Sequence, residues 1–150
     1  MWRAIGDIEQ NNKSEQERHS GWFRDSGLLC HILRVCSVDD LRLHKRFATI
    51  WRSFVCEELL KGFADCMVPV QAVSCWGRKL GADLLLRLPA RHIAIAIPPP
   101  YAAGLWERDG AKLEHFSQTY GCDYGILLGF GRRRARRLST RVFEVPVGCL

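Results

Sequence analysis

Six arginines lie close together near the carboxyl terminus of the chain. Residues 131–150 contain these six and a single acid, Glu144, so the segment carries +5 of the formal net charge of +6. The arginines are Arg132, Arg133, Arg134, Arg136, Arg137 and Arg141. Guanidinium groups pair with phosphate oxygens, and each such contact releases counterions from a nucleic acid. The segment therefore predicts binding of nucleic acid or another polyanion, with a solvated turn that binds nothing as the alternative.

The seven cysteines and five histidines show no spacing typical of a metal centre or of a thiol nucleophile. No C-x2-C pair occurs, the number of cysteines is odd, and several lie in apolar runs, which argues against a zinc site or a disulfide framework. We expect reduced thiols that act as small core residues in an intracellular, cytoplasmic protein. Glycine motifs of the nucleotide-binding type are absent from the sequence as well.

The composition predicts one globular domain. The chain has 150 residues, of which 47% are apolar and 25% are charged, and a domain of this size buries roughly 70% of the surface of its unfolded chain. Its longest apolar runs fall far short of the ~20 residues that cross a bilayer, so no membrane span is expected. Residues 1–19 are polar and predict a disordered arm, which leaves 20–150 as the single domain.

Three helices are expected from apolar residues that recur every three or four positions. Ser26 and Ser37 are candidate caps, and Gly62 is a candidate end of the second helix. The expected ranges are 26–35, 38–61 and 110–120.

Five strands are expected from runs of β-branched and aliphatic residues between turn signals, and Pro98–Pro100 must end the third because proline cannot donate to a ladder. The expected ranges are 67–76, 83–88, 92–97, 124–130 and 140–145. The first three should form antiparallel hairpins. The predicted class is α/β, with a mixed central sheet flanked by helices in the order ααβββαββ.

Several short motifs in the middle of the chain have a recognisable order. Glu57 with Gly62 is followed by Val68-Pro69-Val70, Gly77-Arg78-Lys79-Leu80, Asp83-Leu84-Leu85-Leu86 and finally Gly125 to Gly131. Over roughly residues 40 to 145 the chain resembles the GxxExxY family of the PD-(D/E)XK nuclease superfamily. The resemblance implies a restriction-endonuclease-like sheet and a site that uses two acids and a lysine with Mg²⁺ or Mn²⁺.

The resemblance also marks what this chain lacks. Asp83 matches the first metal-binding acid, and Glu57 matches an acid near the end of the preceding helix. The strand that should bear Glu-x-Lys reads Ile93-Ala94-Ile95-Ala96-Ile97-Pro98, so alanine or proline occupies both functional positions. One carboxylate alone is a poor magnesium site. The resemblance therefore implies a degenerate member of the family without cofactor.

Three functions follow from these observations. The first is a catalytically degenerate nuclease-like domain that binds nucleic acid through the arginine segment. The second is a protein-interaction module, which would use an edge strand, the Pro98–Pro100 loop or the arginine segment to bind a protein partner. The third is an active metal-dependent nuclease in which Lys112 and Glu114, on the expected helix 110–120, replace the missing groups beside Asp83.

Overall fold

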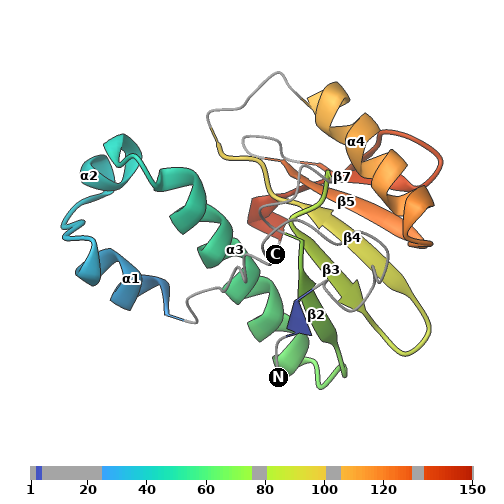
Figure 1. The fold of residues 1–150 in the computed structure, drawn as a ribbon, viewed down its shortest axis with the longest axis horizontal. Helices are drawn as coiled ribbons and strands as arrows, with labels where there is room; N and C mark the ends of the chain where they lie inside the picture. Colours follow the sequence, from blue (N-terminus) through green and yellow to red (C-terminus); the bar gives the residue numbers. More distant parts are fainter. Residues whose placement is uncertain (1–2, 5–24, 76–80, 101–105, 130–133, 150) are drawn as a thin grey trace, which may run out of the picture.

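The computed structural model describes residues 3–4, 25–75, 81–100, 106–129 and 134–149 (Figure 1). Its strands are β1 (Arg3–Ala4), β2 (Gln71–Ser74), β3 (Leu84–Arg87), β4 (His92–Ala96), β5 (Tyr124–Gly129), β6 (Arg136–Arg137) and β7 (Val142–Pro146). Its α-helices are α1 (Ser26–Ile32), α2 (Val38–Leu43), α3 (Phe47–Asp65) and α4 (Trp106–Thr119), and the 3-10 helix η2 (Val147–Cys149) follows β7. The predicted mixed α/β class is confirmed.

The strands form one mixed sheet in the order β1-β2-β3-β4-β5-β7-β6. β2, β3 and β4 are antiparallel neighbours, as the hairpin pattern predicts, and Leu84 pairs with Ile95 across β3 and β4. β5 then runs parallel to β4 and β7 parallel to β5, while β6 is an antiparallel edge strand. The amino ends of β4, β5 and β7 therefore lie together at one end of the sheet, and their carboxyl ends lie at the other.

Each face of the sheet carries its own hydrophobic cluster. Leu113 and Phe116 of α4 pack with Leu85, Ala94 and Leu127 on one face. On the other face the carboxyl-terminal part of α3 packs against β2, β3 and β4. The α3-face cluster joins Val55 and Cys56 to Leu84, Leu86 and Ile95. The short side chains of β4, Ala94 and Ala96, are fully or almost fully buried, which lets α4 approach this strand closely.

The helical region before the sheet differs from the sequence prediction in three details. The expected helix 38–61 is two helices, because the backbone of His44 is extended and ends α2 before α3 begins. α3 then continues past Gly62 to Asp65, and the left-handed residue after it is Met67, with φ 55°. Asp25, one residue before the expected Ser26, caps α1 by accepting a hydrogen bond from the Leu28 N–H. Ser37 caps α2 as predicted.

The first residues of the chain contribute a short strand. β1 lies within the segment expected to be a disordered arm and pairs in parallel with β2. The rest of that arm lies outside the described residues. The cysteines at positions 30, 36, 56, 66, 75 and 122 are free thiols, and three of them are buried. In the described part of the chain no helix is both long enough and apolar enough to cross a membrane.

Gly81 is required where the chain enters β3. Its φ is +91°, and an added Cβ would lie 2.7 Å from the Lys112 carbonyl oxygen of α4. We expect Gly81→Ala to lower the free energy of unfolding by about 2 kcal/mol, through backbone strain and the displacement of α4. The measurement is urea denaturation followed by circular dichroism.

Gly62→Ala is the matched control. Gly62 lies within α3, and an added Cβ would meet nothing within 4 Å. This variant should raise the free energy of unfolding by about 0.5–1 kcal/mol, because alanine favours the helix. Equal effects of the two substitutions would contradict the close approach of Gly81 to α4.

Candidate functional site

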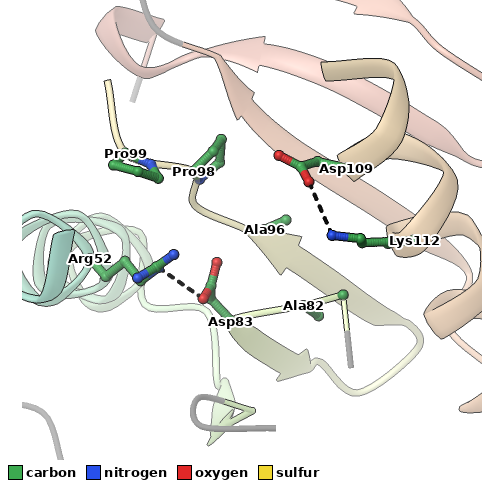
Figure 2. Close-up of a pocket in the computed structure, with 9 residues that line it drawn as sticks. Arg52, Ala82, Asp83, Ala96, Pro98, Pro99, Asp109 and Lys112 are labelled. Atoms are coloured by element: carbon green, nitrogen blue, oxygen red, sulfur yellow. Dashed lines mark ion pairs between the residues drawn. The ribbon is translucent and has the colours of Figure 1, made fainter. Parts of the chain in front are cut away.

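A pocket of about 180 Å³ opens where the carboxyl end of β4 meets the start of β3, between α3 and α4. Its lining residues are Arg52, Gly81, Ala82, Asp83, Ala96, Pro98, Pro99, Asp109 and Lys112. Figure 2 shows Arg52 reaching Asp83 from α3, with Asp109 and Lys112 extending from α4 on the opposite side. Asp83 and Lys112, two of the residues proposed from the sequence, therefore line the same pocket.

Asp83 is held by two neighbouring elements. The Arg52 Nε lies 3.0 Å from the Asp83 Oδ1, and the Ile97 N–H donates to Oδ2 at 2.7 Å. The Asp83 N–H itself donates to the Ile95 carbonyl oxygen, which continues the β3–β4 ladder. Burial raises the pKa of Asp83, while the guanidinium and the Ile97 N–H oppose that rise and the charge of Asp109 adds to it. Both carboxylate oxygens are thus committed to groups of the protein.

The second carboxylate of the pocket also has a cationic partner. The Lys112 Nζ lies 3.6 Å from the Asp109 Oδ1, one turn apart on α4. The side chain of Lys112 is 48% exposed, so this pair is weak compared with the largely buried pair of Arg52 and Asp83. The formal charges of the four ionisable side chains that line the pocket, those of Arg52, Asp83, Asp109 and Lys112, sum to zero.

The positions that resemblance to the nuclease family assigns to Glu-x-Lys fall on this pocket as well. Strand pairing brings the end of β4 beside Asp83, and Ala96 and Pro98 line the pocket with it. In the register that matches Glu-x-Lys to Ala96 and Pro98, the resemblance implies an acid and a lysine where this chain has a methyl group and a proline ring. The Pro98 carbonyl oxygen instead accepts a hydrogen bond of 3.1 Å from the Trp51 indole nitrogen, which ties α3 to the end of β4.

The donor set of the pocket does not fit a divalent cation. Mg²⁺ binds oxygen ligands and is favoured by an excess of negative charge, whereas here each of the two carboxylates already faces a cation. Among the residues with described placement, no group of three or more His, Cys, Asp or Glu side chains is arranged to hold a metal ion. A bound cation would compete with Arg52 for the Asp83 carboxylate.

Two other candidate residues lie away from the pocket. The Glu57 carboxylate accepts a hydrogen bond from the Ser26 N–H at 3.2 Å and pairs with Lys61 Nζ at 3.0 Å, so it joins the start of α1 to α3. Glu114 accepts a hydrogen bond from the Ser139 hydroxyl and another, of 3.2 Å, from Gln118. It therefore links α4 to the loop before β7. Neither residue is brought together with Asp83.

The arginine segment is only partly described. Arg132 and Arg133 lie outside the described residues. The Arg136 Nε donates to Glu144, a fully buried carboxylate, and this pair joins β6 to β7. Arg137 donates to the carbonyl oxygens of Ser139 and Thr140, each at 2.8 Å, and its guanidinium lies 6.0 Å from the centre of the Phe143 ring. Arg136 and Arg137 thus have structural contacts in addition to their charge.

Arg134 and Arg141 are the described members of the segment with the most freedom. Both residues are exposed, and within the described part of the chain neither guanidinium forms a hydrogen bond or an ion pair. Arg141 immediately precedes β7, at the amino end of the parallel strands, whereas the pocket lies at the carboxyl end of β4. Arg141 is therefore separated from the pocket by the length of the parallel strands, whereas Arg134 precedes β6, which runs antiparallel to β7.

Sequence reasoning did not identify Arg52 or Asp109 as site residues. Both are charged residues in helices, where such side chains are usually solvated, and only the tertiary fold brings them beside Asp83. The spacing of Asp109 and Lys112, three positions apart, is the one local signal that pairs them on a helix face. No comparable local signal exists for Arg52, since 31 positions separate it from Asp83.

Comparisons with protein-family models, with curated proteins and with solved structures found no match to this chain. The resemblance to the GxxExxY family thus remains a prediction from the quoted motifs.

A double-mutant cycle tests whether Arg52 and Asp83 act as a pair. Arg52→Met leaves a largely buried carboxylate without its cation, so it should lower the free energy of unfolding by about 2 kcal/mol, whereas Asp83→Asn removes a carboxylate whose charge burial disfavours and should cost less. The loss of free energy of unfolding in the double variant should be smaller than the sum of the two single losses by at least 1 kcal/mol. Urea denaturation provides the measurement, and additive losses would show that the two side chains are not coupled.

The raised pKa of Asp83 predicts a pH dependence of stability. The folded state takes up a proton on Asp83 at a higher pH than the unfolded state, whose carboxyl has the ordinary pKa of 3.8. The contribution of this group to stability is therefore full below pH 3.8 and is lost as the pH rises through the pKa of the folded state. The difference in free energy of unfolding between wild type and Asp83→Asn should widen on acidification from pH 7 to pH 4. A constant difference would contradict the raised pKa.

Proposed function

We propose that this chain is a nuclease-like domain without catalytic activity, which binds nucleic acid through its basic carboxyl-terminal segment. The observation that carries the proposal is the 3.0 Å pairing of Asp83 with Arg52. In the nuclease chemistry that the motifs suggest, the equivalent carboxylate holds a cation that activates water. Here its charge is balanced by a protein side chain, and Ala96 and Pro98 supply no replacement ligand.

The charge distribution supports the binding part of the proposal. The segment 131–150 carries +5 of the net +6, and Arg134 and Arg141 are exposed. The acid of that segment, Glu144, is fully buried and bound to Arg136, so it balances that one arginine and leaves the formal +5 on the other five. Guanidinium groups in such a surface contact phosphates without reading sequence.

A second function, a protein-interaction module, is favoured by the surface of the helical region. Large apolar side chains of α1, α2 and α3 are exposed there, well away from the described arginine segment (Figure 1). They are Leu28, Ile32, Val38, Leu43 and Phe54, of which Leu43 is 87% exposed. Exposed apolar groups of this size are typical of a surface that binds another protein.

The proposed function predicts salt-dependent binding without cleavage. Labelled single-stranded and duplex DNA and RNA should bind the full chain at 50 mM salt. If three phosphates are neutralised, affinity at 200 mM should be about 40-fold lower for duplex DNA and about 20-fold lower for single strands. No strand should be cleaved in Mg²⁺ or Mn²⁺. Replacing Arg132, Arg133 and Arg134 by alanine should weaken binding at least 10-fold.

The control removes the same number of cations from the helical region, by changing the exposed residues Arg42, Lys45 and Arg46 to alanine. This variant should bind as the wild type does. Absence of binding at 50 mM salt would contradict the proposal. Metal-dependent cleavage that is lost in Asp83→Asn would establish the nuclease instead, with Asp109 and Lys112 as the remaining site residues. A stoichiometric protein partner that survives nuclease treatment of the lysate would favour the interaction module.

A further inference from the structure

Arginine and aromatic side chains alternate across four strands at the end of the sheet opposite the pocket. The Arg91 guanidinium lies 5.3 Å from the centre of the Tyr124 ring and donates to its hydroxyl at 2.8 Å. The rings of Tyr124 and Phe143 pack edge to face with their centres 6.1 Å apart, and the Arg137 guanidinium lies over the Phe143 ring. Arg141 immediately precedes β7 beside them. We call Arg91, Tyr124, Arg137, Arg141 and Phe143 the basic rim.

The topology of the sheet brings the basic rim together. Arg91 precedes β4, Tyr124 begins β5 and Arg141 precedes β7, and these three strands are parallel neighbours. Arg137 pairs with Phe143 across β6 and β7. With neighbouring strands about 4.8 Å apart, β4 to β6 span ~14 Å, the length of about four nucleotides at the ~3.4 Å spacing of a stacked strand.

The rings of the basic rim lie on the face of the sheet that α3 covers in part. Gly125 and Leu127 of β5 pack towards α4. Side chains alternate along a strand, so Tyr124, the residue before Gly125, points to the opposite face. Tyr124 and Phe143 are half-buried, whereas Arg91, Arg137 and Arg141 are exposed. The rim therefore presents apolar ring surface bordered by guanidinium groups, of which those of Arg91 and Arg137 are held by hydrogen bonds.

The charge balance at the rim is positive. Two acids lie beside the rim. Asp123 accepts a hydrogen bond from the His92 N–H at 2.8 Å, and Glu114 accepts one from the hydroxyl of Ser139, in the loop between Arg137 and Arg141. The rim has three guanidinium groups against these two carboxylates. Because Arg137 is fixed by two backbone carbonyl oxygens and Arg91 by a hydroxyl, these two lose little freedom on binding a phosphate.

We infer that the basic rim binds single-stranded nucleic acid, with Arg91, Arg137 and Arg141 on phosphates and with bases against Tyr124 and Phe143. This inference rests on the proposed function and places the ligand away from the nuclease-type pocket, since Arg91 and Ala96 are separated by ~17 Å along β4. Aromatic surface beside cations suits single strands, because their bases are free to contact rings while those of a duplex are stacked inside it.

The test measures binding of a labelled pyrimidine 20-mer, as DNA and as RNA, by fluorescence anisotropy of the full chain from 50 to 200 mM salt. Single strands should bind about 10-fold more tightly than the duplex of the same sequence. Arg91→Gln and Arg141→Gln should each weaken binding and reduce the slope of log K against log salt by about 0.7. Phe143→Leu should weaken binding about 10-fold with the slope unchanged, because a ring contact releases no counterion.

Arg42→Gln, in α2, removes one charge far from the rim and should leave binding unchanged. Thermal unfolding of each variant separates lost binding from lost folding, and Arg91→Gln provides a readout if Phe143→Leu proves unstable. Binding by the wild type that none of the three rim variants weakens would overturn the inference and leave the proposed function standing. Tighter binding of the duplex would overturn the single-strand assignment. No binding of any nucleic acid would contradict the proposed function itself.

Discussion

The ion pair between Arg52 and Asp83 decides both how α3 sits on the sheet and what the pocket can do. Asp83 lies at the entry to β3, its carboxylate accepts the N–H of Ile97 just after β4, and Arg52 reaches it from α3. One side chain thus connects the β3–β4 hairpin to α3, which is distant from it in the sequence. Because removing either partner leaves a charge in a largely buried place, the pair constrains which residues can replace each of them. The charge of this carboxylate is balanced by a side chain of the protein.

The two ends of the sheet have different electrostatic characters. At the carboxyl end of β4 the pocket holds two acids and two bases whose formal charges cancel. At the amino ends of β4, β5 and β7 the three guanidinium groups of the basic rim outnumber the neighbouring acids Asp123 and Glu114. Glu144, the one acid of the arginine segment, is buried and is bound by Arg136. The formal charge of the rim is therefore positive, whereas that of the pocket is zero.

Much of the sheet could be predicted from the sequence, whereas the site could be predicted only in part. The alternation of His92 to Ala96, ended by prolines, has a local cause, so strand β4 and its hairpin with β3 were predicted correctly. The break at His44, whose imidazole accepts a hydrogen bond from the Arg46 N–H, and the continuation of α3 through Gly62 were not predicted, because the apolar spacing runs on through His44 and glycine commonly ends a helix. Asp83 and Lys112 were found through motif order, but Arg52 and Asp109 join them through contacts made only in the folded chain. The pairing of Arg91 with Tyr124, 33 positions apart, was equally beyond local patterns.

Diffraction from crystals grown in Mn²⁺ tests the central claim most directly, since the anomalous signal of manganese locates the ion without assumptions about the protein. The account predicts no anomalous peak between Asp83 and Asp109, with Arg52 within ion-pair distance of Asp83. A manganese ion bound by both carboxylates, with Arg52 turned away and Lys112 beside the bound water, would contradict it.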